Sequence, residues 1–493
     1  MSDSAIHFLD QPAGLALGDQ PSLPLFSVRP DQLSEFLAQG KPSAAKQAKL
    51  HGFEASSGQI LLLPDEEGTL EGAVLGLGAA PAVLAFGAAA GALPAGTVWY
   101  IDRTSLIQNG LQTEAPSPTE AADALKNTDF FTQSAELAFM LGAYKYQSQT
   151  AKRNNPARLN AASVRARTIA GCVMMARELI NSPPNLLGPK ELADTAASIA
   201  KRFNAELSRV QNAELKERYP ALYAVGAGSV RAPETVILRW QGSLADASAP
   251  LISLCGKGVC FDTGGYNLKP GNAMRLMRKD MGGAAITLGL ASAIMALDLN
   301  VRLELRIGCV ENSVSGHAMR PSDVLKTRAG FTVEVGDTDA EGRLVLCDLL
   351  YEACEAKPDW LIDIATLTGA ARVALGPDLP ALFCNNDNMA DTILTAGRDG
   401  NDPLWRLPLH EAYAPWLATP FADLCNISSK PFAGAITAAL FLKHFVAPNV
   451  SWAHIDTYAW NDSNRPGKPE GGEAQSLMAL LEAIVRTTKN PIR

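Results

Sequence analysis

The feature that most constrains the fold is an alternation of strand-like and helix-like segments from Ser163 to the C-terminal region. The strand-like segments are short apolar runs at 235–240, 250–255, 302–310, 331–335, 360–364, 380–384 and 452–456. Between them, apolar residues recur with helical spacing at 164–180, 282–296, about 343–355 and 433–446. Such alternation is typical of a sheet with helices on both faces. We therefore expect a three-layer α/β/α domain with a mixed sheet in the middle.

The first 155 residues differ from the rest in composition, because they are rich in Ala, Gly and Pro. Their strand-like runs, at 59–64 and 97–101, are short. A polar stretch follows at 147–156, where few periodic apolar positions occur and Pro156 would stop a helix. We interpret this stretch as a linker. The sequence therefore predicts a smaller N-terminal α/β domain over 1–155 and a larger domain over 156–493.

Composition excludes some broad classes of protein. Apolar residues make up 47% of the chain and charged residues 19%, which is a globular balance without the depletion that marks disorder. The 43 basic residues are outnumbered by 51 acidic ones, giving a formal net charge of -8. This acidic balance argues against nucleic acid as the main partner.

One long segment without charged residues, Gly72–Ile101, has the length of a membrane span. It consists mainly of Ala and Gly, is interrupted by Pro81 and Pro94, and has few of the large apolar residues that drive insertion. We therefore expect short apolar runs joined by Gly-rich turns, and no membrane contact.

The N-terminal residues lack the basic and apolar regions of a secretory signal, so a cytoplasmic location is expected. The eight cysteines include no C-x-x-C pair, which agrees with a reducing compartment. We interpret them as small buried residues.

Four carboxylates lie just after expected strands or just before expected helices: Asp262, Asp280, Asp339 and Glu341. They would meet at one edge of the sheet if the strands that precede them are near neighbours. Converging carboxylates repel one another and lose solvation, so they persist best around a cation. Two divalent metals about 3.5–4 Å apart are a common arrangement for hydrolysis.

A simpler interpretation of these residues stays open at this point. Acidic residues in the first turn of a helix commonly cap it and interact with its dipole, and this applies to Asp339 and Glu341. Lys257 and Lys269 lie in or just after the glycine-rich stretch that contains Asp262, and either lysine taken alone would more often be exposed to solvent. The spacing alone therefore indicates a metal site without establishing one.

Other catalytic chemistries find less support. The six histidines form no H-E-x-x-H motif and no close pair, so a histidine-based zinc site is not expected. The sequence has neither a G-x-S-x-G nucleophile elbow nor a phosphate-binding G-x-x-x-x-G-K-[ST] loop.

At this point the residues resemble a known family. The string Asp337-Thr-Asp-Ala-Glu-Gly-Arg-Leu344 closely resembles the N-T-D-A-E-G-R-L signature of the leucyl aminopeptidases, also called cytosol aminopeptidases. Further resemblance lies in Gly256–Gly265, Asp280–Ala285, Ala365–Ala370 and Ala176–Asn185. It extends from about residue 165 to the C-terminus, whereas the first 155 residues contain little that is diagnostic.

The resemblance implies a role for each matching residue. Two divalent metal ions, Mn²⁺ or Zn²⁺, would be held by Lys257, Asp262, Asp280, Asp339 and Glu341. Asp262 and Glu341 would bridge the metals, Asp339 would complete one site, and Lys257 and Asp280 would complete the other. Lysine ligates only as the neutral amine, so the metals must depress the pKa of Lys257 strongly.

The resemblance also implies the reaction. A hydroxide that bridges the metals would attack the first peptide bond, Lys269 would polarise its carbonyl, and Arg343 would hold a bicarbonate acting as general base. The pocket for the first side chain would include Met277, Thr366 and Gly369. Peptides would be the substrates, the assembly would be a homohexamer, and 156–493 would be the catalytic domain.

Three departures from the family pattern matter. Asp337 replaces the usual Asn and adds an acid beside the site, and Ser322 replaces a common Gly in a loop. The segment 458–476 differs from the family's glycine-rich segment and resembles a bacterial subgroup. Because that region helps to close the side-chain pocket in relatives, the preference for leucine is left open.

The sequence thus leaves three candidate functions. A metal-dependent aminopeptidase is favoured, because all five ligands and both catalytic residues are present. An inactive structural member of the same fold is the first alternative, and the intact ligand set weighs against it. The second is a regulator that binds nucleic acid, for which the acidic balance offers no support.

Overall fold

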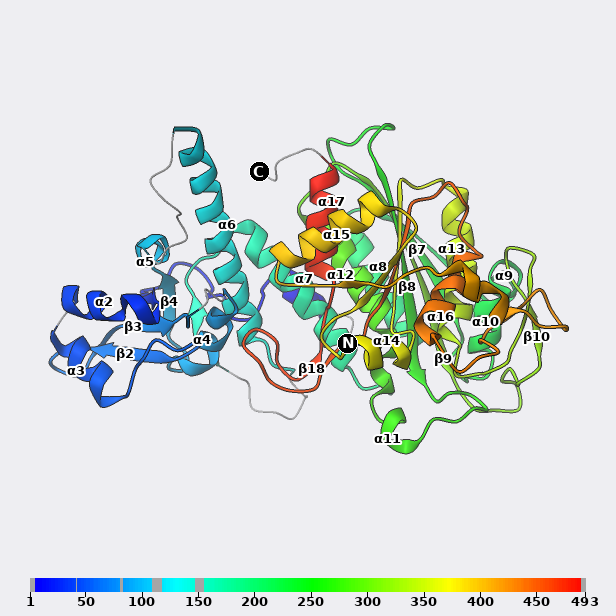
Figure 1. The fold of residues 1–493 in the computed structure, drawn as a ribbon, viewed down its shortest axis with the longest axis horizontal. Helices are drawn as coiled ribbons and strands as arrows, with labels where there is room; N and C mark the ends of the chain where they lie inside the picture. The colour runs from blue at the N-terminus through cyan, green and yellow to red at the C-terminus, as the bar shows by residue number, and fades with distance from the viewer. Residues whose placement is uncertain (1–4, 41, 80–82, 109–117, 147–154, 489–493) are drawn as a thin grey trace. The chain divides into compact units, whose positions relative to one another are not determined.

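The computed structural model describes residues 5–40, 42–79, 83–108, 118–146 and 155–488. Figure 1 shows the course of the chain. Its contacts define two compact units, of which one comprises Met1–His7, Met175–Asp462 and Gly471–Arg493, and the other Phe8–Met174 and Ser463–Glu470. The domain boundary at 155/156 stays a prediction, since these units are defined by contacts alone.

The described part of the larger unit contains an eight-stranded sheet, in the order β14-β13-β16-β12-β8-β9-β7-β6. Its four central strands run parallel: β16 (Trp452–Asp456), β12 (Trp360–Ala365), β8 (Leu251–Asp262) and β9 (Arg302–Asn312). At one edge, β13 (Ala381–Cys384) is antiparallel to β16, and the edge strand β14 (Trp405–Arg406) runs parallel to β13. At the other edge, β7 (Glu234–Gln241) is antiparallel to β9, and β6 (Glu206–Gln211) is antiparallel to β7. The expected mixed sheet is therefore confirmed.

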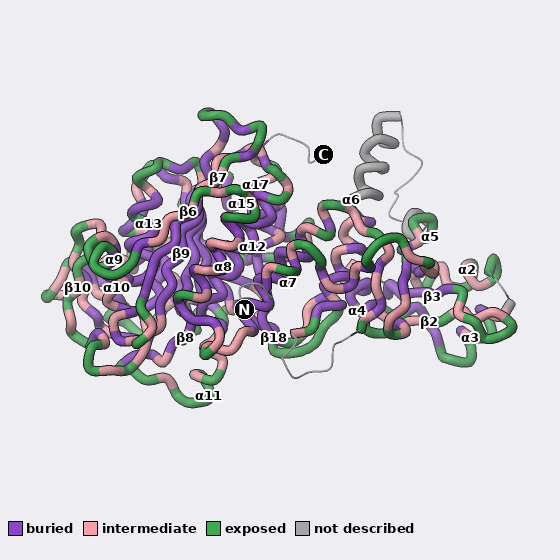
Figure 2. Tube along the Cα trace, turned by 180° about the vertical axis from the view of Figure 1, so that it is seen from behind, coloured by how far each residue is buried: buried purple, intermediate pink, exposed green. Residues whose placement is uncertain are grey.

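Helices cover both faces of this sheet, as Figure 1 shows. On one face lie α10 (Pro220–Gly226), α13 (Gly342–Glu355) and α16 (Gly434–Lys443), whose apolar residues form one core with the strands. The opposite face carries α8 (Pro189–Arg202), α12 (Gly282–Ala296), α15 (Asp387–Asp399) and α17 (Leu477–Thr487). In Figure 2 the strands of the sheet are buried between these layers. The three-layer α/β/α architecture is thus also confirmed.

Glycines allow α12 to lie directly on the sheet. A Cβ atom on Gly283 would be 2.0 Å from the carbonyl oxygen of Ile364 on β12, and one on Gly256 of β8 would be 2.7 Å from Cα of Ala284. Both neighbours are backbone atoms, which cannot rotate away. The start of α12 is therefore fixed against the two central strands.

The segment 331–335 departs from the expectation that it continues the main sheet. Its strand β11 (Thr332–Glu334) pairs with β10 (Val324–Lys326) and β15 (Leu424–Cys425) in a separate three-stranded sheet. Strand β11 directly precedes the loop that leads into α13.

The second unit has a five-stranded sheet in its described residues, in the order β2-β3-β1-β4-β5. Strand β1 (Leu23–Val28) runs parallel to β3 (Leu70–Gly76) and β4 (Val98–Ile101), β5 (Arg158–Leu159) runs parallel to β4, and β2 (Ile60–Pro64) is antiparallel to β3. Its helices include α2 (Leu33–Gln39), α3 (Pro42–Leu50), α4 (Phe86–Ala92), α5 (Arg103–Gln108) and α6 (Pro118–Ala143). The smaller α/β unit that the sequence predicts is confirmed.

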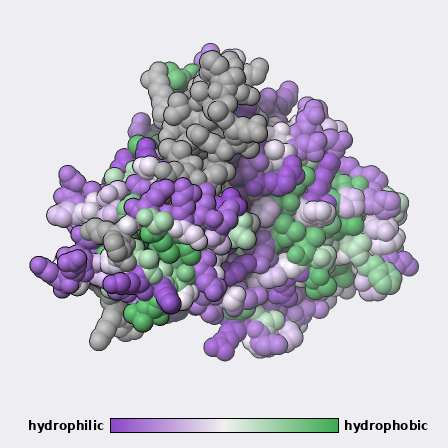
Figure 3. Space-filling view, turned by 60° about the vertical axis from the view of Figure 1, so that its left-hand side comes forward, coloured by the Kyte–Doolittle hydropathy of each residue, from purple (hydrophilic) through white to green (hydrophobic). Residues whose placement is uncertain are grey.

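The uncharged segment 72–101 contains most of β3, all of α4 and β4, and turns, with 80–82 outside the described residues. None of the helices in the described part of the chain combines the length and apolar character needed to cross a bilayer. The face seen in Figure 3 is largely hydrophilic, with apolar side chains gathered in separate patches.

Candidate metal centre and active site

The acidic residues and lysines of the candidate site reach it from four separate segments. Strand β8 supplies Lys257 near its middle and Asp262 at its carboxyl end. Asp280 lies in the short 3₁₀ helix η4 (Met277–Met281) that leads into α12. Glu341 immediately precedes α13, with Asp339 two residues before it, and Lys269 follows β8 in a loop. The site is thus built where β8 meets the beginnings of two helices on opposite faces of the sheet.

Three of the carboxylates form a tight buried group. Asp262, Asp280 and Glu341 each offer an oxygen, and these three oxygens all lie within 4.8 Å of one another. The three residues are at most 4% exposed. Asp339 is partly buried and joins the group through Lys269, whose Nζ lies 2.8 Å from Asp262 Oδ2 and 2.5 Å from Asp339 Oδ1.

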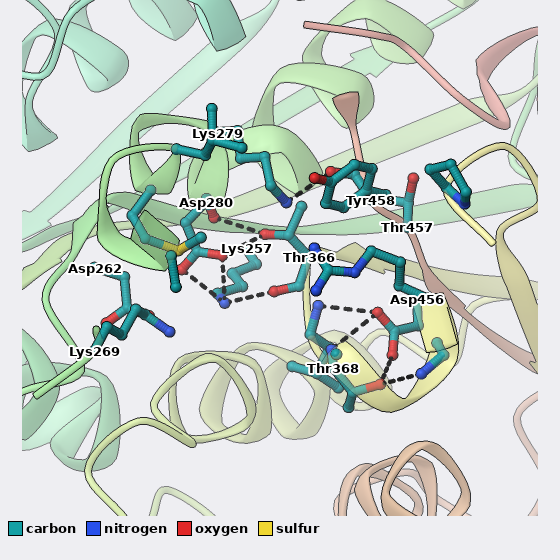
Figure 4. A pocket seen from close by; sticks show the side chains of 18 of the residues that line it. Lys257, Asp262, Lys269, Lys279, Asp280, Thr366, Thr368, Asp456, Thr457 and Tyr458 are labelled. Atoms are coloured by element: carbon teal, nitrogen blue, oxygen red, sulfur yellow. Dashed lines mark hydrogen bonds and ion pairs between the residues drawn. The ribbon is translucent and has the colours of Figure 1, made fainter. Parts of the chain in front are cut away.

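Lys257 is the second cation of this group. Its Nζ lies 2.9 Å from Asp280 Oδ2 and 2.8 Å from Glu341 Oε1, and it donates to the carbonyl oxygen of Thr366 at 2.7 Å. Figure 4 shows Lys257 and Asp280 turned towards each other beside Thr366. The lysine is 2% exposed, so its charge depends on the surrounding carboxylates.

The pKa values of the carboxylates reflect crowding. Burial raises the pKa of Glu341 and of Asp280, and the charge of Asp262 raises both further, while Lys257 opposes these effects. The pKa of Asp339 is also raised, by burial and by Asp262. Burial alone would lower the pKa of Lys257, but the surrounding carboxylates outweigh it, so this pKa is raised. Four carboxylates face two ammonium groups, and the excess negative charge favours additional cations.

Two carboxylate oxygens support the fit to metal ions. Asp280 Oδ2 and Asp339 Oδ1 lie close to lysine nitrogens, yet neither accepts a hydrogen bond of good geometry among the described residues. Buried carboxylate oxygens without such bonds are costly unless a cation satisfies them. The oxygen donors suit hard divalent cations, and the lysine amine suits a metal that also accepts nitrogen, so the residues fit Mn²⁺ or Zn²⁺.

Neighbouring polar groups hold the carboxylates in place. Asp262 Oδ1 accepts from Asn312 Nδ2 and from the backbone N–H of Gly264, both at 2.8 Å. The Thr366 hydroxyl donates to Asp280 Oδ1 at 2.7 Å. Sequence reasoning missed Asn312, although it ends β9 beside the end of β8 and the same rule of strand ends applies to it. These contacts orient the carboxylates toward a common centre.

The predicted residues line one cavity, with one exception. The proposed ligands, Lys269, Met277, Thr366 and Gly369 all line a cavity of about 450 Å³. Arg343 is not among its lining residues. It is 7% exposed, donates through a terminal guanidinium nitrogen to the carbonyl oxygen of Asn426 at 2.6 Å, and burial lowers its pKa to about 10. Its Nε is buried and has no hydrogen-bond partner among the described residues, which leaves a donor for an anion.

A carboxylate cluster at the edge of a three-layer α/β/α sheet, inside a cavity large enough for an amino-acid side chain, defines a metal-dependent hydrolase class. A family model described as the cytosol aminopeptidase family, catalytic domain, matches residues 174–481. A second, described as the M17 aminopeptidase N-terminal domain, matches residues 23–115. The chain therefore belongs to the cytosol aminopeptidase family, a family of metal-dependent exopeptidases, as its resemblance to that family implied.

Individual relatives agree with this assignment. The chain is 43% identical over 323 residues to a probable cytosol aminopeptidase of Rickettsia bellii, a match that spans 64% of either chain. A probable cytosol aminopeptidase of Synechococcus sp. (strain CC9902) is 36% identical over 464 residues, covering 90% of this chain and 91% of the relative. The shorter match spans less than two thirds of the Rickettsia protein.

Solved structures extend the likeness to the whole fold. The crystal structure of a cytosol aminopeptidase from Coxiella burnetii has a TM-score of 0.87 at 39% identity, covering 96% of this chain and 99% of that one. The bottromycin maturation enzyme BotP in complex with Mn has a TM-score of 0.80 at 30% identity, covering 95% of this chain and 100% of that one.

Proposed function

We propose that this chain is an aminopeptidase that removes the N-terminal residue from peptides with the help of two divalent metal ions, Mn²⁺ or Zn²⁺. The observation that carries the proposal is the buried group of Asp262, Asp280 and Glu341, whose oxygens lie within 4.8 Å of one another. Membership of the cytosol aminopeptidase family supports the same reaction. A manganese complex of BotP supports the choice of metal.

The five ligands would be shared between the two metals. Asp262 and Glu341 would bridge them, Asp339 would complete one site, and Lys257 with Asp280 would complete the other. Lys257 would have to lose its proton to ligate, and its position between Asp280 and Glu341 supports this role. When bound, the metals would supply Lewis acidity and would lower the pKa of water.

Lys269 would polarise the carbonyl of the first peptide bond. Its ammonium group is held at the edge of the cluster by Asp262 and Asp339, and it lines the cavity. A fixed positive charge at this position stabilises the negative charge that develops on the carbonyl oxygen during hydrolysis. Arg343 would hold a bicarbonate acting as general base, using the donor that its unpartnered Nε offers.

The first side chain of the peptide would lie against Met277, Thr366 and Gly369. All three line the cavity beside the proposed ligands, and Thr366 contacts both Lys257 and Asp280. By the same family resemblance, we propose a homohexamer located in the cytoplasm, with peptides as its substrates.

Removal and return of the metal would test the proposal. Protein stripped with a chelator should release almost no amine from L-leucinamide or an aminoacyl anilide, and added Mn²⁺, Zn²⁺ or Co²⁺ should restore release. Asp339→Ala should lose the restored activity, because one site would lack a ligand. Asp337→Asn is the matched control, since it removes an acid two residues away and restores the residue usual in the family.

Two outcomes would contradict the proposal. Undiminished activity in Asp339→Ala would show that this carboxylate is no ligand. Absence of hydrolysis with every metal would favour the inactive structural member, and DNA binding that weakens steeply with salt would favour the regulator.

A further inference from the structure

Three side chains form the wall of the cavity beyond the predicted side-chain pocket. Lys279 Nζ lies 4.2 Å from the centre of the Tyr458 ring, and Arg372 Cζ lies 5.0 Å from the same centre. All three residues line the cavity. Figure 4 shows Lys279 reaching across to Tyr458, on the side of Thr366 away from Asp262 and Lys269. The ring thus holds two cations together, which we call the cationic wall.

The cationic wall lies next to the residues predicted to contact the first side chain of the peptide. Lys279 follows Met277 by two residues within η4. Arg372 follows Gly369 by three residues in α14 (Gly369–Leu375), and residues at this spacing share one face of a helix. A side chain that enters between Met277 and Gly369 would therefore point at the wall.

Neither cation has an ion-pair partner among the described residues. Lys279 is 5% exposed and donates to the carbonyl oxygen of Tyr458 at 2.7 Å, which uses one of its three N–H groups. Arg372 is exposed to the cavity and is held by the tyrosine ring. Ring contacts stabilise a cation without neutralising its charge. The wall therefore retains capacity for an anion.

The nearby carboxylates are engaged elsewhere. Asp456 accepts from the backbone N–H groups of Leu367 and Thr368 and from the Thr368 hydroxyl. Asp462 accepts from the Tyr458 hydroxyl at 3.3 Å. Asp280 is paired with Lys257. Asp280 and Asp456 favour the charged form of Lys279, but no ion pair joins a carboxylate of the described residues to either wall cation. Both cations therefore remain available to an anionic side chain.

We propose that the cationic wall selects peptides whose first residue is glutamate or aspartate. The proposal rests on the proposed aminopeptidase function and specifies its substrate class. A side-chain carboxylate would accept charge-assisted hydrogen bonds from Arg372 and Lys279, which are stronger than neutral ones. An apolar side chain would remove water from both cations without offering a hydrogen bond or an opposite charge in its place. A lysine or arginine side chain would be repelled by the two cations.

Isosteric substrates would test the proposal directly. We expect the metal-loaded enzyme to hydrolyse glutamyl p-nitroanilide with a kcat/KM about tenfold or more above that for glutaminyl p-nitroanilide, since the two side chains match in size and shape but only the first is an anion. The leucyl compound should rank with the glutaminyl one, and the lysyl compound should be poorest. Arg372→Gln should lower the glutamyl-to-glutaminyl ratio about tenfold, mainly through the KM of the glutamyl compound.

Arg275→Gln is the matched control. Arg275 is also exposed and lies close in sequence to the cavity residues Leu276 and Met277, but it does not line the cavity. Its substitution removes the same charge from the protein and should leave the ratio unchanged. An equal fall of the ratio in both variants would indicate a general effect of net charge and would overturn the role of the wall.

The outcomes separate this inference from the proposed function. Hydrolysis of leucyl and glutaminyl compounds at rates equal to or above the glutamyl rate would refute the selection and leave the aminopeptidase intact. Loss of all activities together in Arg372→Gln would make Arg372 a structural residue. Failure of every substrate with every metal would overturn both proposals.

Discussion

Gly342 shows how little space the candidate site leaves around its buried lysine. A Cβ atom at this position would lie 2.6 Å from Cε and 2.8 Å from Nζ of Lys257. Glycine between Glu341 and Arg343 is therefore a steric requirement of the lysine's position. The signature string thus contains one residue, at the start of α13, whose role is to leave room for a side chain on β8.

Substitution of this glycine should disturb the proposed metal site without unfolding the protein. In Gly342→Ala, Lys257 would be pushed from its place between Asp280 and Glu341, and we expect metal affinity and kcat/KM to fall about 10–100-fold. Metal titration and steady-state kinetics would measure the two effects. Gly271→Ala, where an added Cβ meets no atom within 4 Å, is the control. Unchanged metal affinity in Gly342→Ala would contradict the assignment of Lys257.

His454 lies fully buried in the sheet and should make stability depend on pH. Its Nδ1 lies 2.6 Å from Asp363 Oδ1, and Trp452 donates to the other oxygen of that carboxylate at 2.7 Å. Burial lowers the pKa of His454, but Asp363 outweighs burial and the pKa is raised. Asp456 on the same strand adds to this rise, and Arg343 on α13 opposes it.

A raised pKa means that the folded protein binds this proton more tightly than the unfolded chain. The resulting stability is fully present below about pH 6.5, the unfolded value, and is lost as the pH rises through the folded pKa. Breaking a buried ion pair costs about 3–5 kcal/mol. The free energy of unfolding of the wild type should therefore exceed that of His454→Gln by the largest amount at low pH. Denaturant unfolding of both proteins at pH 5.5 to 9 would measure this difference. A difference that is constant across this range would contradict the prediction.

At the scale of single residues, the sequence indicated the carboxylates that the structure brings together better than it indicated their neighbours. The four carboxylates stand out because each follows a strand or precedes a helix, whereas a ligand role for Lys257 came only from family resemblance. Asn312, Lys279 and Tyr458 escaped notice. Asn312 could have been found from its place at a strand end, and Tyr458 begins the divergent segment 458–476, but the contacts of Lys279 with Tyr458 arise only when η4 and the residues after β16 meet in space.

At the scale of elements, the close contact between α12 and the sheet determines where Asp280 lies. Gly283→Ala would place a Cβ 2.0 Å from the carbonyl oxygen of Ile364, and relief would require α12 to move away from β12. We expect a loss of about 3 kcal/mol in the free energy of unfolding. Denaturant midpoints would measure it. Gly91→Ala, on an open face of α4, is the control and should leave the free energy of unfolding unchanged or raise it by up to about 1 kcal/mol. An equal loss of unfolding free energy in both variants would contradict the role of the contact with Ile364.

The segment 331–335 explains why one part of the fold could not be predicted. Its apolar run is typical of a buried strand, but sequence pattern does not state which sheet a strand joins. The structure places β11 in a separate small sheet. Asp339 and Glu341 nevertheless reach the site, because the loop after β11 leads to α13, which packs against β8. The edge strand β6 (Glu206–Gln211) was also not expected, since its sequence is mostly polar and Val210 is its one buried residue.

At the scale of the whole molecule, the change in composition near residue 155 indicated a second, smaller α/β domain, whereas the contact-defined units divide between Met174 and Met175. Each of the two contact-defined units is made of segments that are not consecutive in the chain. Ser463–Glu470 belongs to the same unit as Phe8–Met174, while the residues on either side of it belong to the other unit. Within that unit the fit is tight, since a Cβ on Gly87 would lie 2.2 Å from the backbone nitrogen of Gly467.

This membership has an evolutionary consequence. The segment 458–476 departs from the family pattern, and its middle part, Ser463–Glu470, shares a unit with Phe8–Met174. A substitution near Gly87 changes the space available to Gly467, so drift in one region constrains drift in the other. Across homologues the two should covary, and a chimera that imports a foreign N-terminal half should inherit the foreign 463–470 segment with it.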